Sequence, residues 1–386
     1  MDVLVLMSRN IAQKSVTDLL RDDCGCYTRG NNETGSHYFT FVDNFGSICG
    51  DSGTGNFSMI SLEESQTAEI FRRRPFMGLF LIAHCWLCIL ATIVIVGFLP
   101  NVLTILLGIL VIGSRQQALL VLMHEASHGN LFEHKLFNYW AAQFLCAYPV
   151  LADTKVYRTY HAKHHAWTQT KKDPDLVLTS GYPISKNSMM RKILRDMIGI
   201  TGVRQLYNRF SIAFEDKESR LSKKFKTLFR LIGPGLLVNT SFLALFVHLG
   251  YGWIFFSLWL VPLLTWHQVV LRIRNISEHA ALVNYLRTEL SVARTTLTSS
   301  LGNFFIAPYW VNYHLEHHLF PSVPCYNLPI VHRLLKKQGY WSKANLEDGY
   351  YAVLKKITHY NHQKPLKARK TRLVGSFTKG YKEVEI

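Results

Sequence analysis

Acidic residues and paired cysteines are both scarce in this sequence of 386 residues. Seven cysteines are an odd number, and Cys85, Cys88 and Cys146 fall in or near apolar segments. A small secreted domain held together by disulfides spaces an even number of cysteines through polar sequence, so that class is excluded. Only 26 acidic residues stand against 43 lysines and arginines, and the formal net charge is +17. Such a basic chain suits an anionic partner.

Motifs for the common redox cofactors are also absent. The chain has no G-x-G-x-x-G, no C-x-x-C-H, no Rieske pair of C-x-H and C-x-x-H, and no H-P-G-G of a cytochrome b5 domain. Residues 1–7 are too short, and lack the basic residues, for a conventional signal peptide. If this chain carries out oxidation or reduction, it needs metal ions held by its own side chains.

Charge is missing from four long apolar stretches. Most of them are long enough to approach the ~30 Å hydrocarbon core of a bilayer. Very short uncharged links, Leu99-Pro100 and Tyr251-Gly252, join them in two pairs. A soluble protein with buried core helices is the alternative, but the paired arrangement favours a membrane. We predict an all-α integral membrane protein with two transmembrane helical hairpins, whose four spans are about 77–98, 101–123, 231–250 and 252–270.

The basic residues predict how the spans are oriented. Arg72, Arg73 and Arg74 precede the first span, and nearly all other lysines and arginines lie before it, between the hairpins or after the last span. By the positive-inside rule, both termini and the central loop are predicted to be cytoplasmic. Between residues 186 and 226 this loop alternates charged and apolar residues, which indicates amphipathic helices on the membrane surface or a solvated cap.

Composition divides the chain into three predicted parts. Residues 1–70 are expected to be a flexible cytosolic segment, because residues 24–58 are rich in Gly, Asn, Asp, Ser and Thr and show no apolar period. Residues 71–345 are expected to form the membrane domain, with a cytosolic helical cap that carries the metal site. Residues 346–386 are expected to form a basic C-terminal tail.

Histidine is abundant in three clusters, H-E-A-S-H, H-A-K-H-H and H-L-E-H-H. In a helix, residues i, i+3 and i+4 lie on one face, so each cluster offers a set of metal ligands. Neutral imidazole binds Fe, Cu, Zn and Ni, and eight ring nitrogens exceed the four ligands of one tetrahedral ion. The count therefore predicts two metal ions on the cytoplasmic side. The candidate ligands are His124, His128, His161, His164, His165, His314, His317 and His318.

Two other metal-dependent functions are compatible with parts of this pattern. His124 to His128 match the H-E-x-x-H signature of zinc proteases, with Glu125 as the general base, but a protease leaves the other two clusters without a role. A metal transporter needs polar residues along its spans, which hold few beyond His84, His248 and His267.

The pattern H-x3-H, H-x2-H-H, H-x2-H-H, separated by helical hairpins, resembles the membrane fatty acid desaturase and hydroxylase superfamily from about Pro75 to about residue 340. The resemblance implies a non-haem di-iron centre held by histidine, an O2-dependent reaction and a kinked hydrophobic tunnel for a lipid chain. It implies no separate acid or base. The sequence from Asn312 to Pro321 resembles the third histidine motif of acyl-lipid desaturases. The motif begins with His314, where front-end desaturases usually have Gln, which argues against that subgroup.

The resemblance also implies a ninth histidine, preceded by an asparagine that acts through water. Asn275 and His279 match that N-x3-H pair, and residues i and i+4 face the same way. His267 is left out of the ligand set, although it could face the site. Metal-bound histidines commonly donate their second N–H to a carboxylate, and several acidic residues adjoin the clusters. Ordinary caps or surface ion pairs are equally compatible with Glu125, Asp173, Asp175, Glu278 and Glu316.

The partners follow from the electron count of the implied reaction. Two ferrous ions deliver two of the four electrons that O2 cleavage requires, so a separate donor, of cytochrome b5 or ferredoxin type by resemblance, is expected. The basic cytosolic face suits an acidic donor or anionic lipids, and no nucleic-acid partner is expected. We expect a desaturase that acts on an acyl-lipid or acyl-CoA. A hydroxylase or ketolase of lipids, sphingolipids or carotenoids is the alternative, although the N-Y-x-x-H-Y motif of alkane hydroxylases is absent.

Overall fold

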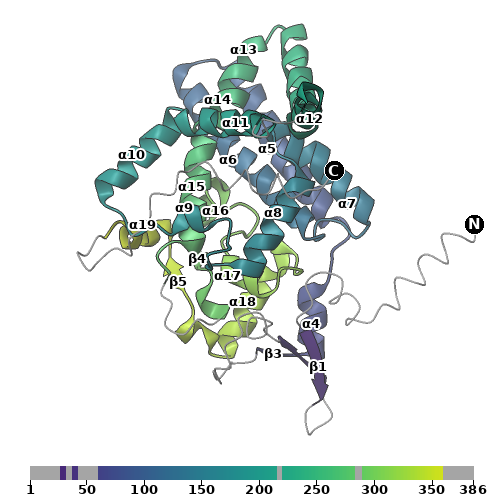
Figure 1. Cartoon of the computed structure of the whole chain (residues 1–386), viewed down its shortest axis with the longest axis vertical. Helices are drawn as coiled ribbons and strands as arrows, with labels where there is room; N and C mark the ends of the chain where they lie inside the picture. Colours follow the sequence, from purple (N-terminus) through teal and green to yellow (C-terminus); the bar gives the residue numbers. More distant parts are fainter. Residues whose placement is uncertain (1–26, 32–36, 42–59, 215–219, 283–288, 360–386) are drawn as a thin grey trace, which may run out of the picture.

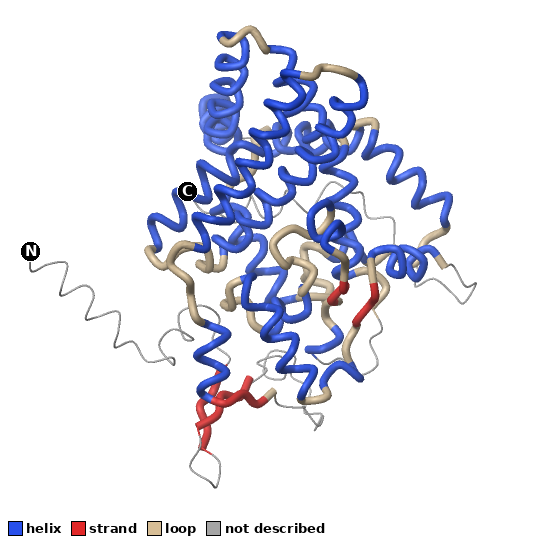
Figure 2. Tube along the Cα trace, turned by 180° about the vertical axis from the view of Figure 1, so that it is seen from behind, coloured by secondary structure: helices blue, strands red, loops and turns tan. Residues whose placement is uncertain are grey.

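The computed structural model describes residues 27–31, 37–41, 60–214, 220–282 and 289–359. Helices make up most of these ranges, and the few strands are short (Figure 2). Four of the helices are long and apolar enough to cross a membrane, which confirms the predicted helical membrane protein with four spans. The spans are α5 (Met77–Phe98), α6 (Val102–Ser127), α12 (Leu221–His248) and a composite fourth span that contains α13 (Gly252–Ile254), the π-helical turn η3 (Phe255–Leu260), α14 (Val261–Leu264) and α15 (Trp266–His279).

The spans differ from the predicted bounds in one consequential way. Each of them except α5 continues beyond the apolar stretch from which it was predicted: α6 runs through the first histidine cluster, and α15 runs to His279. The fourth span is also not one regular helix. It breaks at Thr265, whose φ of −117° and ψ of −90° lie outside the helical region, three residues after Pro262, which has no backbone N–H to donate. The break separates α14 from the segment that carries His279.

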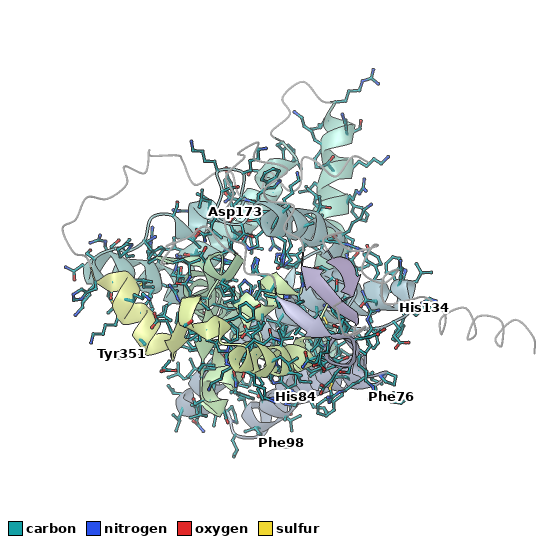
Figure 3. All side chains as sticks on the ribbon, turned by 90° about the horizontal axis from the view of Figure 1, so that it is seen from below. Phe76, His84, Phe98, His134, Asp173 and Tyr351 are labelled. Atoms are coloured by element: carbon teal, nitrogen blue, oxygen red, sulfur yellow. The ribbon has the colours of Figure 1, made fainter. Side chains whose placement is uncertain are left out.

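Each hairpin has a local reason to turn where it does. Asn101 is the N-cap of α6, and its side chain accepts a hydrogen bond from the Thr104 N–H at 3.0 Å while the Thr104 hydroxyl accepts from the Asn101 N–H. In the second hairpin, Gly250 has a φ of +79°, which a residue without a side chain adopts without strain. Phe76 and Phe98, at the two ends of α5, lie at the edge of the molecule (Figure 3), as expected of lipid-facing residues.

Aromatic and small residues pack the spans against one another. The Trp86 ring of α5 stacks on Trp259 of the fourth span with centroids 5.9 Å apart, and Phe242 of α12 meets the same pair edge-on. Gly113 of α6 lies so close to α15 that an added Cβ would be 3.0 Å from the backbone nitrogen of His267. This close approach fixes α6 beside the helix that carries His279.

Between the two hairpins, the chain forms a series of shorter helices. In Figure 1 the helices that carry the histidine clusters, α6, α8, α15 and α17, meet in the centre of the view, below α12 and α13. Asp153 caps α8, and its carboxylate accepts from the Val156 N–H at 2.9 Å. Helices α10 and α11 expose apolar residues, including Ile198 and Tyr207. The segment comprises α7 (Lys135–Ala142), η1 (Gln143–Ala147), η2 (Tyr148–Val150), α8 (Thr154–Trp167), α9 (Leu176–Thr179), α10 (Lys186–Met197) and α11 (Ile200–Ile212).

The remaining elements form an N-terminal group, β1 to α4, and a C-terminal group that contains the third histidine motif. Strands β4 and β5 pair in parallel, and the other strands form an antiparallel sheet in the order β1-β2-β3. These elements are β1 (Tyr27–Asn31), β2 (His37–Phe41), β3 (Ser61–Glu63), α4 (Glu64–Phe71), η4 (Glu289–Ser291), β4 (Thr295–Leu297), α16 (Ser300–Phe305), α17 (His314–Leu319), η5 (Cys325–Asn327), α18 (Leu328–Lys337), η6 (Tyr340–Lys343), β5 (Leu346–Asp348) and α19 (Tyr350–Thr358).

Packing contacts continue on both sides of residues 71–345, the predicted bounds of the membrane domain. The Asn327 amide donates to the carbonyl oxygens of Ile70 and Arg72, which holds α4 against the domain. At the other end, Val353 and Ile357 of α19 are buried in the core that includes Ile276. The predicted flexible segment and basic tail otherwise lie mostly outside the described residues, and their division from the domain stays a prediction.

Candidate metal centre

Nine histidines converge in two groups, and all of them were predicted from the sequence. Within each group the candidate ligand atoms lie within 4.8 Å of one another. The groups draw on four helices that are far apart in the chain: α6, α8, α15 and α17. We call them the five-histidine cluster, which is His124, His128, His161, His165 and His317, and the four-histidine cluster, which is His164, His279, His314 and His318.

Each H-x-x-H-H motif contributes to both clusters, and helix geometry explains the division. At 3.6 residues per turn, positions i and i+4 differ by about 40° around the axis, whereas i+3 lies about 60° on the other side of i. His161 and His165 therefore point to one cluster and His164 to the other. In the third motif, His314 and His318 share the four-histidine cluster while His317 turns to the five-histidine cluster. The expectation that each motif presents one common face is refined accordingly.

The ring nitrogens are spaced as ligands of shared ions. In the five-histidine cluster, the Nε2 atom of His317 lies 3.0 Å from the Nε2 atoms of both His124 and His165. In the four-histidine cluster, the Nε2 atom of His279 lies 2.9 Å from that of His314 and 3.2 Å from that of His164. Two nitrogens that bind one ion at about 2.1 Å on adjacent positions are about 3 Å apart. The donor set therefore fits two first-row transition-metal ions, one in each cluster.

Burial keeps most of these imidazoles in the neutral form that binds metal. Burial lowers the pKa of His161, His165 and His317 well below the usual value, and neighbouring histidines lower it further. Burial also lowers the pKa of His128 to about 3. His164 is different: burial lowers its pKa, but Asp175 and Asp173 outweigh burial and hold the pKa above its ordinary value.

Asp173 orients His164, which is one of the two roles that the sequence leaves open for this carboxylate. The His164 Nδ1–H donates to the Asp173 carboxylate at 2.9 Å, which leaves Nε2 facing the four-histidine cluster. Asp173 also accepts from the backbone N–H groups of Gln169 and Asp175, so the carboxylate is itself held in place. Its side chain is buried. A carboxylate in this position fixes the ring and raises its basicity as a ligand.

Glu316 lies inside the third histidine motif, His314 to His318, and anchors the helix that carries it. Its carboxylate, which is fully buried, accepts from the Thr295 hydroxyl and from the His332 Nδ1–H, the latter at 2.5 Å. The Thr295 oxygen in turn accepts from the Leu315 N–H. Strand β4 and helix α18 therefore both hold α17, and His332 supports the site without belonging to either cluster.

Two further carboxylates secure other parts of the site. Glu125 accepts from the Cys325 N–H at 2.9 Å, which links α6 to the turn after α17. The protease alternative needs the Glu125 carboxylate as a free base, whereas here it is engaged in this hydrogen bond. Glu278 pairs with Arg274 at 2.6 Å, and its other oxygen lies 3.6 Å from the His314 Nε2.

Arg294 holds the end of α15, and the sequence did not single it out. Its guanidinium donates to the carbonyl oxygens of Ser277, Ala280 and Ala281, which a helix end leaves unpaired. His279 lies within this stretch, and its Nδ1 is 3.1 Å from the Val292 carbonyl oxygen. Local sequence offered no signal for Arg294, because the contacts depend on the chain returning beside α15.

A cavity of about 140 Å³ adjoins the four-histidine cluster and descends between the spans. His161, His164, His279 and His314 line its metal end. Asn275, predicted to act through water, also lines it, one helical turn before His279; a role at the metal stays a prediction. The rest of the wall is mixed. Apolar residues such as Leu120, Met123, Val150, Leu263 and Leu271 alternate with the polar residues Gln117, Tyr157, Gln205, Arg209, His267 and Gln268.

Two polar residues of this wall lie outside the predicted site: His267, which the predicted ligand set leaves out, and Gln117, which no motif includes. The signal was present: Ser114, Arg115, Gln116 and Gln117 form a polar run inside an apolar helix, and all four are buried. Polar side chains at such depth are commonly functional.

The histidines outside the clusters have other contacts. His84 is 3.0 Å from the Tyr309 hydroxyl, and the His134 ring accepts from the Phe137 N–H at the start of α7. His248 is exposed at the far end of α12. His37 lies in β2, His359 follows α19, and His362 is outside the described residues.

Comparison with known proteins agrees with this site. The sequence model of the fatty acid desaturase family matches residues 97–347, which include every histidine of both clusters. The dihydrorhizobitoxine desaturase of Bradyrhizobium elkanii is 29% identical over 249 residues, which are 61% of this chain and 68% of the relative. The chain therefore belongs to the fatty acid desaturase family, and it is an integral membrane oxidoreductase of the desaturase and hydroxylase type.

Proposed function

We propose that this protein is an O2-dependent di-iron desaturase that introduces a double bond into the carbon chain of a lipid. The observation that carries the proposal is the position of the cavity, which joins the four-histidine cluster to the interior of the spans. A chain bound there would lie between walls of mixed apolar and polar residues, with one segment beside the histidine clusters. The related desaturase supports removal of hydrogen as the reaction.

The five-histidine cluster would hold one iron and the four-histidine cluster the other, with Asn275 adding a water-mediated contact to the second. Bound iron supplies the oxidising power that cleavage of an unactivated C–H bond needs, because it reacts with O2. The protein itself contributes position. Leu120, Met123 and Leu271 line the cavity and exclude water from it, and the Asp173 carboxylate keeps the His164 ring in one orientation.

Electrons must come from a separate donor, of cytochrome b5 or ferredoxin type, because the chain lacks a second redox group. We place the metal centre and both termini on the cytoplasmic side. Arg72, Arg73 and Arg74 precede the first span, and the third span, α12, begins with basic residues. By the positive-inside rule, these ends of the two spans face the cytoplasm. A C-terminal reporter active only in the cytoplasm tests this orientation; activity of a reporter confined to the opposite side would reverse it.

The function is tested by expressing the chain in a host that supplies a compatible donor and comparing total lipids by mass spectrometry. A new product lighter than its precursor by two hydrogens supports desaturation. A product heavier by one oxygen would show hydroxylation instead, and cleaved membrane peptides would revive the protease. The matched control is the His317→Ala variant, which should reach the membrane and yield neither lipid product.

A further inference from the structure

Three uncharged polar side chains line the cavity, although a plain hydrocarbon chain needs none of them. They are Gln117 on α6 and His267 and Gln268 on α15. All three are more than nine-tenths buried, with exposed fractions of 0%, 3% and 6%. In the part of the chain that the structure describes, both side-chain atoms of the Gln117 amide, the Nδ1 of His267 and the Oε1 of Gln268 have no hydrogen-bond partner.

These three residues lie on the membrane side of the metal centre. Gln117 precedes His124 on α6 by about two turns, or about 10 Å, and His267 precedes His279 on α15 by about 18 Å. Along both helices, the chain runs from the membrane-spanning part toward the histidine clusters. Gln117 and His267 are therefore displaced from the clusters in the same direction. These three residues thus line the part of the cavity that lies among the spans, together with Leu263 and Leu264.

Buried polar groups without partners are destabilising, by about 1–3 kcal/mol each. The neighbouring glutamine on α6 differs in degree: the Gln116 amide nitrogen donates to the Trp259 carbonyl oxygen at 2.8 Å, only its Oε1 lacks a partner among the described residues, and it lies outside the cavity. Gln117 instead presents both of its polar atoms without a partner. Polar groups convergent on one end of an apolar pocket are what fixes the orientation of a small ligand.

We propose that Gln117, His267 and Gln268 bind an uncharged group of the substrate that both donates and accepts hydrogen bonds, such as a hydroxyl or an amide. This group is at the end of the substrate's carbon chain that enters the cavity first. This specificity rests on the proposed lipid oxidation at the same site. The substrate is then not a simple fatty acyl chain but one with a polar terminal group.

The charge of that group follows from the atoms that remain free. The Gln268 Nε2 already donates to the Leu263 carbonyl oxygen at 3.1 Å, so its free atom is an acceptor and would repel a carboxylate. Arg274 is paired with Glu278. Arg209 keeps its charge while it donates to the Leu151 carbonyl oxygen, but it is not one of the three residues that lack partners. An uncharged donor and acceptor satisfies the free amide oxygen and the free amide nitrogen together.

The test uses fatty acids of several lengths and their terminally hydroxylated and terminally carboxylated counterparts. Membranes that contain the full-length protein and its electron donor would receive each fatty acid in competition with its hydroxylated or its carboxylated counterpart. The quantity measured would be the kcat/KM of the modified acid divided by that of the plain acid. We expect the wild type to prefer the hydroxylated member of at least one pair, and Gln117→Met to reduce that ratio roughly tenfold, because one or two hydrogen bonds are lost. Gln116→Met is the matched control, the same change one residue away and outside the cavity, and should keep the wild-type ratio.

Binding provides a second measurement that does not depend on turnover. The hydroxylated acid should raise the melting temperature of the purified wild type and of Gln116→Met more than that of Gln117→Met. If no probe is oxidised but this difference in binding remains, the proposed lipid oxidation fails and the recognition site stands. Equal treatment of the paired acids by the wild type in both measurements would overturn the site. An unchanged ratio in Gln117→Met, with wild-type iron content as evidence of folding, or a stronger preference for the dicarboxylic acid, would do the same.

Discussion

At the scale of single residues, the site depends on which cluster each histidine joins. A side chain displaced by one helical position changes its direction by about 100°, which is enough to move an imidazole from one cluster to the other. His164 and His317 show this, since each belongs to the cluster opposite to that of its two motif partners. The two residues therefore report on different metal ions.

Replacing either residue should separate the two ions. His164→Ala should reduce iron in the four-histidine cluster and His317→Ala iron in the five-histidine cluster. Either change should lower activity by more than the roughly 10- to 100-fold that loss of an outer partner causes. Iron per protein and product formation are the measurements. His248→Ala, at an exposed site at the far end of α12, should retain both, and full activity in either cluster variant would exclude the di-iron assignment.

Asp173 offers a subtler change at the same scale. Asp173→Asn keeps the size of the side chain but removes the charge that accepts the His164 Nδ1–H, so the ring loses its fixed orientation. We expect iron affinity or activity to fall roughly 10- to 100-fold. Glu347→Gln is the control, because Glu347 pairs with Lys356 at a partly exposed site between β5 and α19. Equal iron affinity in the two variants would mean that Asp173 only closes its own loop.

At the scale of elements, close helix contacts hold the cavity in shape. Gly202 of α11 lies against the backbone of α14, where an added Cβ would be 2.6 Å from the Leu264 carbonyl oxygen. Gly97 of α5 has room, since an added Cβ would meet only the Ile254 side chain at 3.6 Å. Both glycines are inside helices, but only one is required by its neighbours.

The same substitution should therefore have opposite signs at these two positions. Gly202→Ala should destabilise the protein by about 1–3 kcal/mol, because α11 must move away from α14. Gly97→Ala should stabilise it by up to about 1 kcal/mol, because alanine favours a helix. Thermal unfolding of the detergent-purified variants measures both. A gain in stability at Gly202 would show that α11 does not depend on close contact with α14.

At the scale of the whole molecule, the clusters place many neutral imidazoles in one buried region. The folded-state pKa values of His128, His161, His165 and His317 lie below the ordinary value, so below about pH 6.5 the unfolded chain binds more protons than the folded one. Their contribution to stability is complete above that pH and is lost as the pH falls. His164, whose pKa is raised, contributes in the opposite sense.

Acidification should consequently release iron and then unfold the protein. Because the histidines with a lowered pKa, which also include His314 and His318, outnumber the one with a raised pKa, we expect the metal-free protein to lose up to ~1.4 kcal/mol for each extra proton and pH unit below about 6.5. Iron content and melting temperature, followed from about pH 7.5 to about pH 5, provide the measurement. A melting temperature that rises on acidification would contradict the neutral state of the clusters.

The sequence by itself determined the spans and the candidate ligands. Charge-free stretches long enough for a bilayer predict helices such as α5 wherever they occur, because burying an unpaired backbone in lipid is so unfavourable. The spacing of His161, His164 and His165 likewise needs only a helix to become a ligand set. Both inferences depend on residues that are neighbours along the chain.

Only the tertiary structure decided how these parts meet. The assembly of the two clusters from four helices, the support of α15 by Arg294 and the polar residues beside Gln117 all depend on distances between remote segments. The break at Thr265 matters for the same reason, since it sets the direction in which α15 leaves the spans. Such distances follow from the packing of whole helices, and no local pattern of residue types specifies that packing.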